Sequence, residues 1–533
     1  MFSPAASRRQ VFCEIALIFA VFFIQGAWPV PDVNETYYLA KAIHFWRPDW
    51  LRGDFFMESA NAHWMFCMTF GWLATWLSPA ATAWTVRTLI WAALAWAWRR
   101  LSYAVVPRRW WAVLTAALFV CLLERCHMAG EWVIGGAEAK PFAYVFILLG
   151  IESLARNRWN RALLLFGAGA AFHVLVGGWS VVAAGVAWLW LRYGSRREAA
   201  LLPPPLFSLW PGLLGGLLLA LPAVVPAVML DWSVGREVAR EAHQIYVFER
   251  LPHHLTLAGI KPLFILRLAL LSIVWLLLGR LERRETDDVE GQEQKNVFRL
   301  RAFVAGAVAI TCVGVAVNAL MFVDRPLAAD LLRYYWFRLT DVAVPLGVAL
   351  EGVALIVGGM SRRSRLSSPR FWLAVAVMAA AAQLGDRVQD HLVPSAPRSH
   401  HIAAFDDWLA ACRWVADPTN QDVPPDARFF VPRLAQAFEW YTGHGDVADW
   451  KNVPQSAEEI VQWRQYMQDI YATGSDWPAG PRWFEQPADL GAERLRALGR
   501  KYGVRYVITQ PTQPLPGFDV LYRNNNYAVL RMP

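Results

Sequence analysis

Long apolar runs separated by short arginine clusters dominate this chain from its start to about residue 393. The chain has 533 residues, of which 56% are hydrophobic and only 18% are charged. Such runs are typical of membrane spans, because about 20 apolar residues in a helix cross a bilayer. The fold class that we predict is mostly α, a polytopic membrane protein with about 11 transmembrane helices. A small extracytoplasmic α/β domain is predicted to follow these spans.

Arginine clusters orient the runs, since Lys and Arg prefer the cytoplasmic ends of membrane helices. Arg8 and Arg9 precede the first run, residues 11–28, and place the N-terminus in the cytoplasm. The run at residues 64–77 is too short for a crossing and is predicted to be an interfacial or re-entrant helix. Further pairs are predicted on the cytoplasmic side, with the tail on the other: Arg99-Arg100, Arg283-Arg284 and Arg362-Arg363.

The net charge of +8 lies in these clusters, which favours membrane lipids as partners and gives no sign of nucleic-acid binding. The predicted location is a bacterial inner membrane, with the C-terminal domain outside the cytoplasm. The run at residues 162–190 has arginines at both ends, so it is predicted to go out and return. Two short helices that break near Gly177-Gly178 would do this, provided that protein covers their exposed backbone groups.

The first outer loop, residues 29–63, concentrates acidic residues in a chain that is otherwise mostly apolar. Asp32 and Glu35 stand at the start of a helix-forming stretch, and Asn34 is positioned to cap that helix. A capped start would hold Glu35 at the membrane surface, beside the positive end of the helix. The loop is either a hydrated segment whose acids face water or an active-site loop.

Other ionisable groups cluster at the ends of the predicted spans. Arg333 and Arg338 can converge on a phosphate, and Arg338 can also pair with Asp341, three residues further along the helix. Lys140 either anchors a span at the headgroups or joins this site. We predict no metal ligands here, because adjacent histidines point to different sides of a helix. The candidate substrate-binding residues are Arg333, Arg338, Lys140, His63, Asp54, His253 and His254.

The composition changes at about residue 394, which divides the chain into a membrane domain (1–393) and a soluble domain (394–533). Ser456 and Glu459 predict a capped helix that runs to about residue 471. Helices are also predicted at residues 401–416 and 489–502, strands at 428–431 and 504–509, and a hairpin at 518–532. The tail contains no glycine-rich phosphate loop, nucleophile elbow or metal-ligand spacing, so it is interpreted as a lid or recognition module. The sequence assigns no cofactor and leaves a divalent cation open.

The first outer loop and the run after it carry a resemblance to a known family. The stretch VNETYYLAKAIHF, followed by HWMFCMTFGWLATWLSPAATAWTVRTLIWAALAWAWRR, resembles the start of the GT-C superfamily of membrane glycosyltransferases. That resemblance implies transfer of a sugar from a polyprenyl-phosphate donor on the outer side of the membrane. In the family pattern an Asp-Glu pair begins the loop helix, and the Asp is the catalytic base. This chain has Asn34-Glu35 instead, so the resemblance leaves Glu35 or Asp32 to act as base.

A second resemblance extends over most of the chain, the tail included. Stretches such as GGAEAKPFAY, FHVLVGGWS and FFVPRLAQAFEWYTGHGDVADWKNVPQSAEEIVQW are similar to those of uncharacterised bacterial multi-spanning proteins. This likeness implies an overall layout and no particular activity.

Three functions follow as hypotheses. The first is a glycosyltransferase whose donor phosphate is held by Arg333, Arg338 or Lys140 and whose base is Glu35 or Asp32. The second is a non-catalytic membrane protein that binds a lipid or glycan and presents its tail to partners. A transporter is the third, although polar groups near the midplane and repeated halves are not evident. Whether the chain is an enzyme is therefore open between the first hypothesis and the other two.

Overall fold

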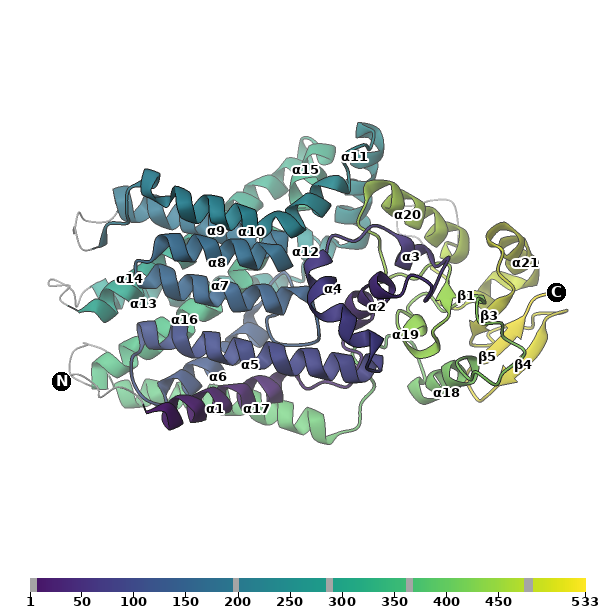
Figure 1. Ribbon diagram of the computed structural model, residues 1–533, viewed down its shortest axis with the longest axis horizontal. Helices are drawn as coiled ribbons and strands as arrows, with labels where there is room; N and C mark the ends of the chain where they lie inside the picture. Colours follow the sequence, from purple (N-terminus) through teal and green to yellow (C-terminus); the bar gives the residue numbers. More distant parts are fainter. Residues whose placement is uncertain (1–6, 195–200, 284–290, 361–367, 474–482) are drawn as a thin grey trace.

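Most of the protein is one bundle of long helices, and the tail covers one end of it (Figure 1). The computed structural model describes residues 7–194, 201–283, 291–360, 368–473 and 483–533. The N-terminus lies at the end of the bundle away from the tail (Figure 1). Between bundle and tail lie the short helices of the first outer loop.

Seven helices in the described ranges are long and apolar enough to cross a membrane by length and composition. The chain is therefore a multi-pass membrane protein. These helices, with the short turns that continue some of them, are α1 (Arg8–Gly26), α9 (Val174–Leu189) with η2 (Trp190–Gly194), η4 (Leu206–Leu209) with α10 (Trp210–Met229), α13 (Pro262–Arg283), α14 (Gln292–Ala319) with η6 (Leu320–Phe322), α16 (Arg338–Met360) and α17 (Pro369–Leu392).

Four further helices belong to the same bundle and pack against these seven (Figure 1). They are α5 (Pro79–Val105), α6 (Trp111–Cys126), α7 (Ala139–Ala155) and α8 (Trp159–Phe172). Because α6, α7 and α8 have 16, 17 and 14 residues, they are short for a full crossing. The count of about 11 spans, and the orientation of the termini, stay predictions.

The break between α8 and α9 corrects the sequence prediction. It falls at His173 and not near Gly177-Gly178. His173 is extended, with φ −148° and ψ 100°, and its ring nitrogen accepts a hydrogen bond from the Val176 amide. Gly177 lies inside α9, where a Cβ would come within 2.3 Å of the Ala170 amide nitrogen. The glycine therefore serves close helix packing and does not end the helix.

Short helices lie toward the end of the bundle that the tail covers (Figure 1). The segment predicted to be interfacial or re-entrant, residues 64–77, folds as two short helices, too short to cross a membrane. These and the other outer helices are α2 (Glu35–Trp46), α3 (Phe55–Glu58), α4 (Trp64–Phe70), η1 (Gly71–Thr75), α11 (Arg236–Gln244), η5 (Ile245–Arg250), α12 (Pro252–Leu255) and α15 (Arg325–Leu332).

The tail contains a five-stranded mixed sheet in the order β2-β1-β3-β5-β4. The strands β1, β2 and β3 are parallel, whereas β5 runs antiparallel to both β3 and β4. The predicted strands, helices and final hairpin are all present to within a few residues. The elements are α18 (Phe405–Val415), β1 (Arg428–Phe430), α19 (Phe438–Thr442), β2 (Gly445–Asp446), α20 (Ala457–Tyr471), η7 (Pro487–Leu490), α21 (Gly491–Tyr502), β3 (Tyr506–Thr509), β4 (Asp519–Arg523) and β5 (Ala528–Arg531).

The tail is held against the first outer loop by backbone and side-chain hydrogen bonds. The Glu459 carboxylate accepts the Ala60 amide hydrogen at 3.0 and 3.1 Å, and Gln455 Oε1 accepts that of Ala62 at 2.7 Å. Ser456 caps α20 as predicted, and its hydroxyl also donates to Glu459 at 2.6 Å. The capping residues of α20 thus also fix the loop beneath it.

The arginine pairs that motivated the topology are only partly within the described residues. Arg99 pairs with Glu14 of α1 at 2.7 Å, which places it near the N-terminal helix and away from the tail. Arg284, Arg362 and Arg363, and the side chain of Arg283, lie outside what the structure describes.

The close packing of α8 against α10 depends on the absence of a side chain at Gly167. A Cβ at Gly167 would lie 2.2 Å from the Gly216 carbonyl oxygen of α10, whereas one at Gly178 meets nothing within 4 Å. Gly167→Ala should therefore destabilise the protein by about 1–3 kcal/mol, the usual cost of overpacking. Gly178→Ala is the matched control and should leave thermal unfolding in detergent unchanged. Equal unfolding temperatures for the two variants would contradict this packing.

Candidate functional site

The first predicted base, Glu35, is completely buried and fully hydrogen-bonded. Its carboxylate forms a bidentate pair with Arg87 of α5, with both N–O distances at 2.6 Å. The Asp32 and Ala137 amides each donate to it at 2.7 Å. Four donors occupy its two oxygens, so the geometry favours a structural role in which Glu35 ties the first loop to α5.

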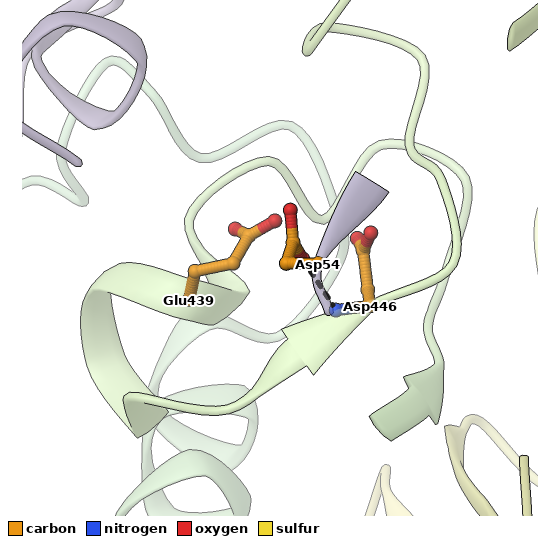
Figure 2. A group of neighbouring side chains, drawn as sticks. All are labelled: Asp54, Glu439 and Asp446. Carbon is orange, nitrogen blue, oxygen red and sulfur yellow. Dashed lines mark hydrogen bonds between the residues drawn. The ribbon is translucent and has the colours of Figure 1, made fainter. Parts of the chain in front are cut away.

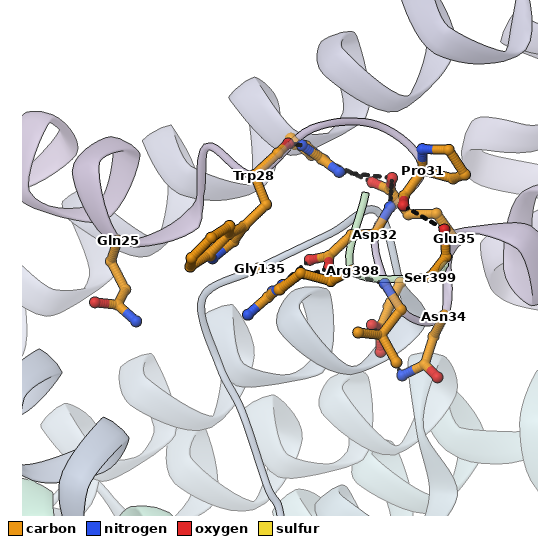
Figure 3. A network of polar contacts seen from close by, with 12 residues as sticks. Gln25, Trp28, Pro31, Asp32, Asn34, Glu35, Gly135, Arg398 and Ser399 are labelled. Carbon is orange, nitrogen blue, oxygen red and sulfur yellow. Dashed lines mark hydrogen bonds and ion pairs between the residues drawn. The ribbon is translucent and has the colours of Figure 1, made fainter. Parts of the chain in front are cut away.

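The second predicted base, Asp32, is paired in the same way with a residue of the tail segment. Arg398 Nε and Nη2 lie 2.8 and 2.7 Å from its two oxygens. Figure 3 shows the two side chains in this network of polar contacts. Burial raises the pKa of Asp32, but the charge and hydrogen bonds of Arg398, the charge of Arg87 and the Val33 amide together hold it below its ordinary value. Asp32 therefore stays ionised within an ion pair, which also favours a structural role.

Asn34 does not cap α2, contrary to the sequence prediction. It occupies the capping position, but its side chain makes no capping hydrogen bond and instead donates to Glu138 Oε1 at 3.0 Å. Glu138 precedes α7 and is 2% exposed. Its second oxygen, Oε2, makes no hydrogen bond to any residue that the structure describes. Burial raises the pKa of Glu138, and the charge of Lys140 only partly offsets this.

Glu131 is the centre of a second group of contacts, close to Glu138 along the chain. Its carboxylate lies 3.3 Å from Lys140 Nζ, 3.4 Å from Arg338 Nε and 3.1 Å from the Tyr144 hydroxyl. The Arg338 guanidinium also stacks on the Tyr335 ring at 3.7 Å. Two predicted phosphate ligands, Lys140 and Arg338, thus share one carboxylate.

The predicted pair between Arg338 and Asp341 is wrong. Asp341 instead accepts hydrogen bonds from three amides of the loop before α7, at 2.7–3.2 Å, those of Met128, Ala129 and Glu131. Since backbone donors already satisfy this carboxylate, Arg338 is left to pair with Glu131. Asp341 positions the loop that carries Glu131.

Cations from the outer loop before α12 and from the tail join this group. Arg250 donates to the Lys451 carbonyl at 3.3 Å, and its Nε has no hydrogen-bond partner within the described ranges. Burial and the charge of Arg250 lower the pKa of Lys451 to about 8. Cations and carboxylates are thus mixed in this region: the cations are Arg250, Lys140, Arg338 and Lys451, and the carboxylates are Asp32, Glu131, Glu138, Asp341 and Asp449.

The histidines near this group are neutral at pH 7. Burial and the charge of Arg250 lower the pKa of His253 to about 4. Burial also lowers the pKa of His254, whose Nδ1 lies 2.7 Å from the Ala129 carbonyl. For His63, burial lowers the pKa to about 4, and its ring packs at a tilt against that of Tyr38, with the centroids 4.9 Å apart. These rings therefore shape the site and add no charge to it.

A small pocket opens beside Arg338. It is lined by Tyr144, His173, Leu175, Val176, Trp179, Tyr335, Arg338 and Leu339. Its volume of about 10 Å³ holds about one water molecule. A sugar would enter only after the surrounding loops move. His63 reaches the edge of this pocket through His173, with ring centroids 6.1 Å apart.

Two predicted binding residues lie elsewhere. Arg333 pairs with Asp231 at 3.1 Å and contacts His243, so its partners differ from those of Arg338. Asp54 gathers with Glu439 and Asp446 of the tail. The structure thus brings together Lys140, Arg338, His253 and His254, and it separates Arg333 and Asp54 from them.

Sequence reasoning missed Glu131, Arg250 and Lys451 as members of the site. Glu131 had a visible signal, since it stands seven residues before Glu138 in the same short outer loop. Arg250 and Lys451 lie far from that loop in sequence, and no spacing connects them to it. Only the fold of the tail onto the bundle brings them near.

Comparison with known proteins gives one family match. A family model described as "Domain of unknown function (DUF6798)" matches residues 406–470, a segment that includes Lys451. No curated protein matches the chain. Among solved structures, the Archaeoglobus fulgidus oligosaccharyltransferase in complex with Zn and sulfate is 12% identical, with a TM-score of 0.40. That match covers 94% of this chain and 68% of that chain. A likeness at this score carries no argument about function.

The buried pair of Glu35 and Arg87 gives a testable consequence. Glu35→Gln leaves the Arg87 guanidinium buried without a carboxylate, and breaking such a pair costs about 3–5 kcal/mol of stability. The double variant Glu35→Gln/Arg87→Met removes both charges and should recover much of that loss. Thermal unfolding of the purified variants measures this. A Glu35→Gln variant as stable as the wild type would contradict the structural role.

Proposed function

We propose that this protein is a membrane glycosyltransferase that takes a sugar from a polyprenyl-phosphate donor. The observation that carries the proposal is a group of buried cations beside a buried carboxylate whose second oxygen has no hydrogen-bond partner among the described residues. Glu138 is this carboxylate, and the charges of Lys140 and Lys451 act on it. Lys140 also shares Glu131 with Arg338. The site lies at the end of the bundle that the tail covers, which we assign to the outer face of a bacterial inner membrane. The acceptor would therefore be extracytoplasmic.

The donor phosphate would bind between Arg338 and Lys140. Both now pair with Glu131 at 3.3–3.4 Å, distances longer than a strong charge-assisted hydrogen bond. A phosphate offers more oxygen acceptors than one carboxylate and can bridge the two cations. Once the surrounding loops have moved, the apolar side chains that line the adjoining pocket, among them Leu175 and Leu339, would suit the lipid end of the donor.

Glu138 is the base that this geometry supports best. It would take the proton of the acceptor hydroxyl as that oxygen bonds to the anomeric carbon. The bond from this carbon to the phosphate oxygen breaks, and the phosphate leaves with the electron pair. Arg338 and Lys140 stabilise the charge on the leaving phosphate. Asn34 holds one oxygen of Glu138 and leaves the other, Oε2, for the acceptor.

A second candidate is a non-catalytic protein that binds a lipid phosphate or glycan. The observation that favours it is the ion pairing of Asp32 and Glu35, the two residues that the sequence predicted as bases. Under this alternative the cations still bind a phosphate, but Glu138 accepts no proton from an acceptor. The two candidate functions therefore differ in the role of one residue, Glu138.

Glu138→Gln should slow transfer by roughly 10²–10⁴-fold, the usual contribution of a general base. The amide keeps the hydrogen-bonding shape but cannot take a proton. The assay is release of polyprenyl phosphate from a synthetic polyprenyl-phosphate hexose added to membranes that contain the protein. Glu58→Gln, the same change at an exposed position of the first outer loop, is the control and should retain full rate.

The dependence of the transfer rate on pH gives a second test of Glu138 as the base. A base works when deprotonated, so the rate is present above its pKa and lost as the pH falls through it. Because the pKa of Glu138 is raised, the wild-type rate should fall at a higher pH than an ordinary glutamate would give. An undiminished rate in Glu138→Gln would rule out Glu138 as the base. Release no faster than background from the wild type would instead favour the binding function.

A further inference from the structure

Three carboxylates meet where the tail rests on the first outer loop. Asp54 stands before α3, Glu439 lies on α19 and Asp446 ends β2. One oxygen of each lies within 4.8 Å of the others, and all three side chains are buried. Figure 2 shows them pointing toward one another from three separate elements.

Two of these side chains have oxygens without hydrogen-bond partners. Glu439 Oε1 and Asp446 Oδ2 contact no donor among the residues with described positions, although the residues are only 2% and 3% exposed. Asp54 is better satisfied, since the Met57 and Asp446 amides donate to its two oxygens at 2.8 and 3.1 Å. A buried carboxylate oxygen without a donor is costly, so these two oxygens require a cation or a shared proton.

The positive charges near the three carboxylates do not neutralise their negative charge. Arg428 acts on Asp54 and Asp446, and Lys41 acts on Asp54. The Lys41 ammonium is already bound to the Met57 carbonyl and to Ser59, at 2.6–3.2 Å. A fourth carboxylate, Asp449, adds negative charge to the same region. The negative charges therefore exceed the positive ones.

Burial and the repulsion between the carboxylates make protons bind more tightly to them. They raise the pKa of Glu439 and of Asp446 well above the ordinary values. Carboxylates in this condition either hold protons or bind a metal ion that replaces those protons.

We propose that Asp54, Glu439 and Asp446 bind a divalent cation of the hard, oxygen-preferring class, with Ca²⁺ as the best fit. All three donors are carboxylate oxygens, which suit Ca²⁺ and do not select zinc or copper. Ligands on opposite sides of a Ca²⁺ ion lie about 4.8 Å apart, at about 2.4 Å from the metal. The spread of the three oxygens, all within 4.8 Å, accommodates that ion.

Such an ion would fasten the tail to the first outer loop. Asp54 belongs to the loop, whereas Glu439 and Asp446 belong to the tail, so binding requires that both be in place. The same interface already holds the hydrogen bonds of Ala60 and Ala62 to the tail. This role is independent of the proposed transfer reaction.

The test is Ca²⁺ binding by the purified full-length protein. After treatment with a chelator, CaCl₂ is added, and thermal unfolding and bound calcium are measured. We expect the unfolding temperature to rise with Ca²⁺ and one ion to bind per chain. Glu439→Gln and Asp446→Asn each remove a ligand and should weaken binding by at least about 10–100-fold, the loss seen even for outer-shell partners. Asp417→Asn, at an exposed tail carboxylate, should respond as the wild type does.

A different set of results is expected if no calcium ion binds. If the cluster shares protons and holds no ion, neutralising one member relieves repulsion, so Glu439→Gln or Asp446→Asn is more stable than the wild type. In that case the wild-type unfolding temperature does not change with CaCl₂. This pair of results would overturn the proposal. Should one variant fail to fold, the other variant and the wild-type response still decide between the two results.

Discussion

The buried ion pair of Glu35 and Arg87 is the contact on which the outer end of the bundle depends. It joins the start of α2 to α5, and its carboxylate also accepts the Ala137 amide hydrogen of the next outer loop. A buried charge is tolerated only with full compensation, and here four donors provide it. Because the loop before α7 is fixed in this way, Glu138 is held beside Asn34.

The outer loops and the tail together form the site. Glu131 and Glu138 come from one loop, Arg250 from another, and Lys451 from the tail. Each of these contributes a charge that is costly to bury alone, and each is stable only because the others are near. The tail is thus a structural part of the site, which refines its earlier interpretation as a lid or recognition module.

The sequence predicted the general architecture well and the site only in part. Apolar runs and turn residues carry enough local information to place most helices and the tail strands. The break at His173 was mislocated because glycines end helices in some contexts and permit close packing in others, as Gly177 does. Local sequence does not distinguish these two uses.

The site was harder to predict because its contacts are between distant segments. Glu35 has the residue type and position of a base, but its pairing with Arg87 depends on how α2 packs against α5. Asp54 was assigned to the substrate site by its loop, yet the fold places it against Glu439 and Asp446. Arg338 and Lys140 share the carboxylate of Glu131, a partner that local sequence did not indicate, and their role as phosphate ligands stays a prediction.

The central claim is that Arg338 and Lys140 bind a lipid-linked phosphate within reach of Glu138. Cryo-electron microscopy of the protein in lipid nanodiscs with added polyprenyl phosphate tests it most directly. We predict phosphate density between the two cations, with the Arg338 side chain turned away from Glu131 and the lipid chain against the adjoining apolar side chains. Phosphate density elsewhere, with Arg338 and Lys140 still paired to Glu131, would contradict the claim.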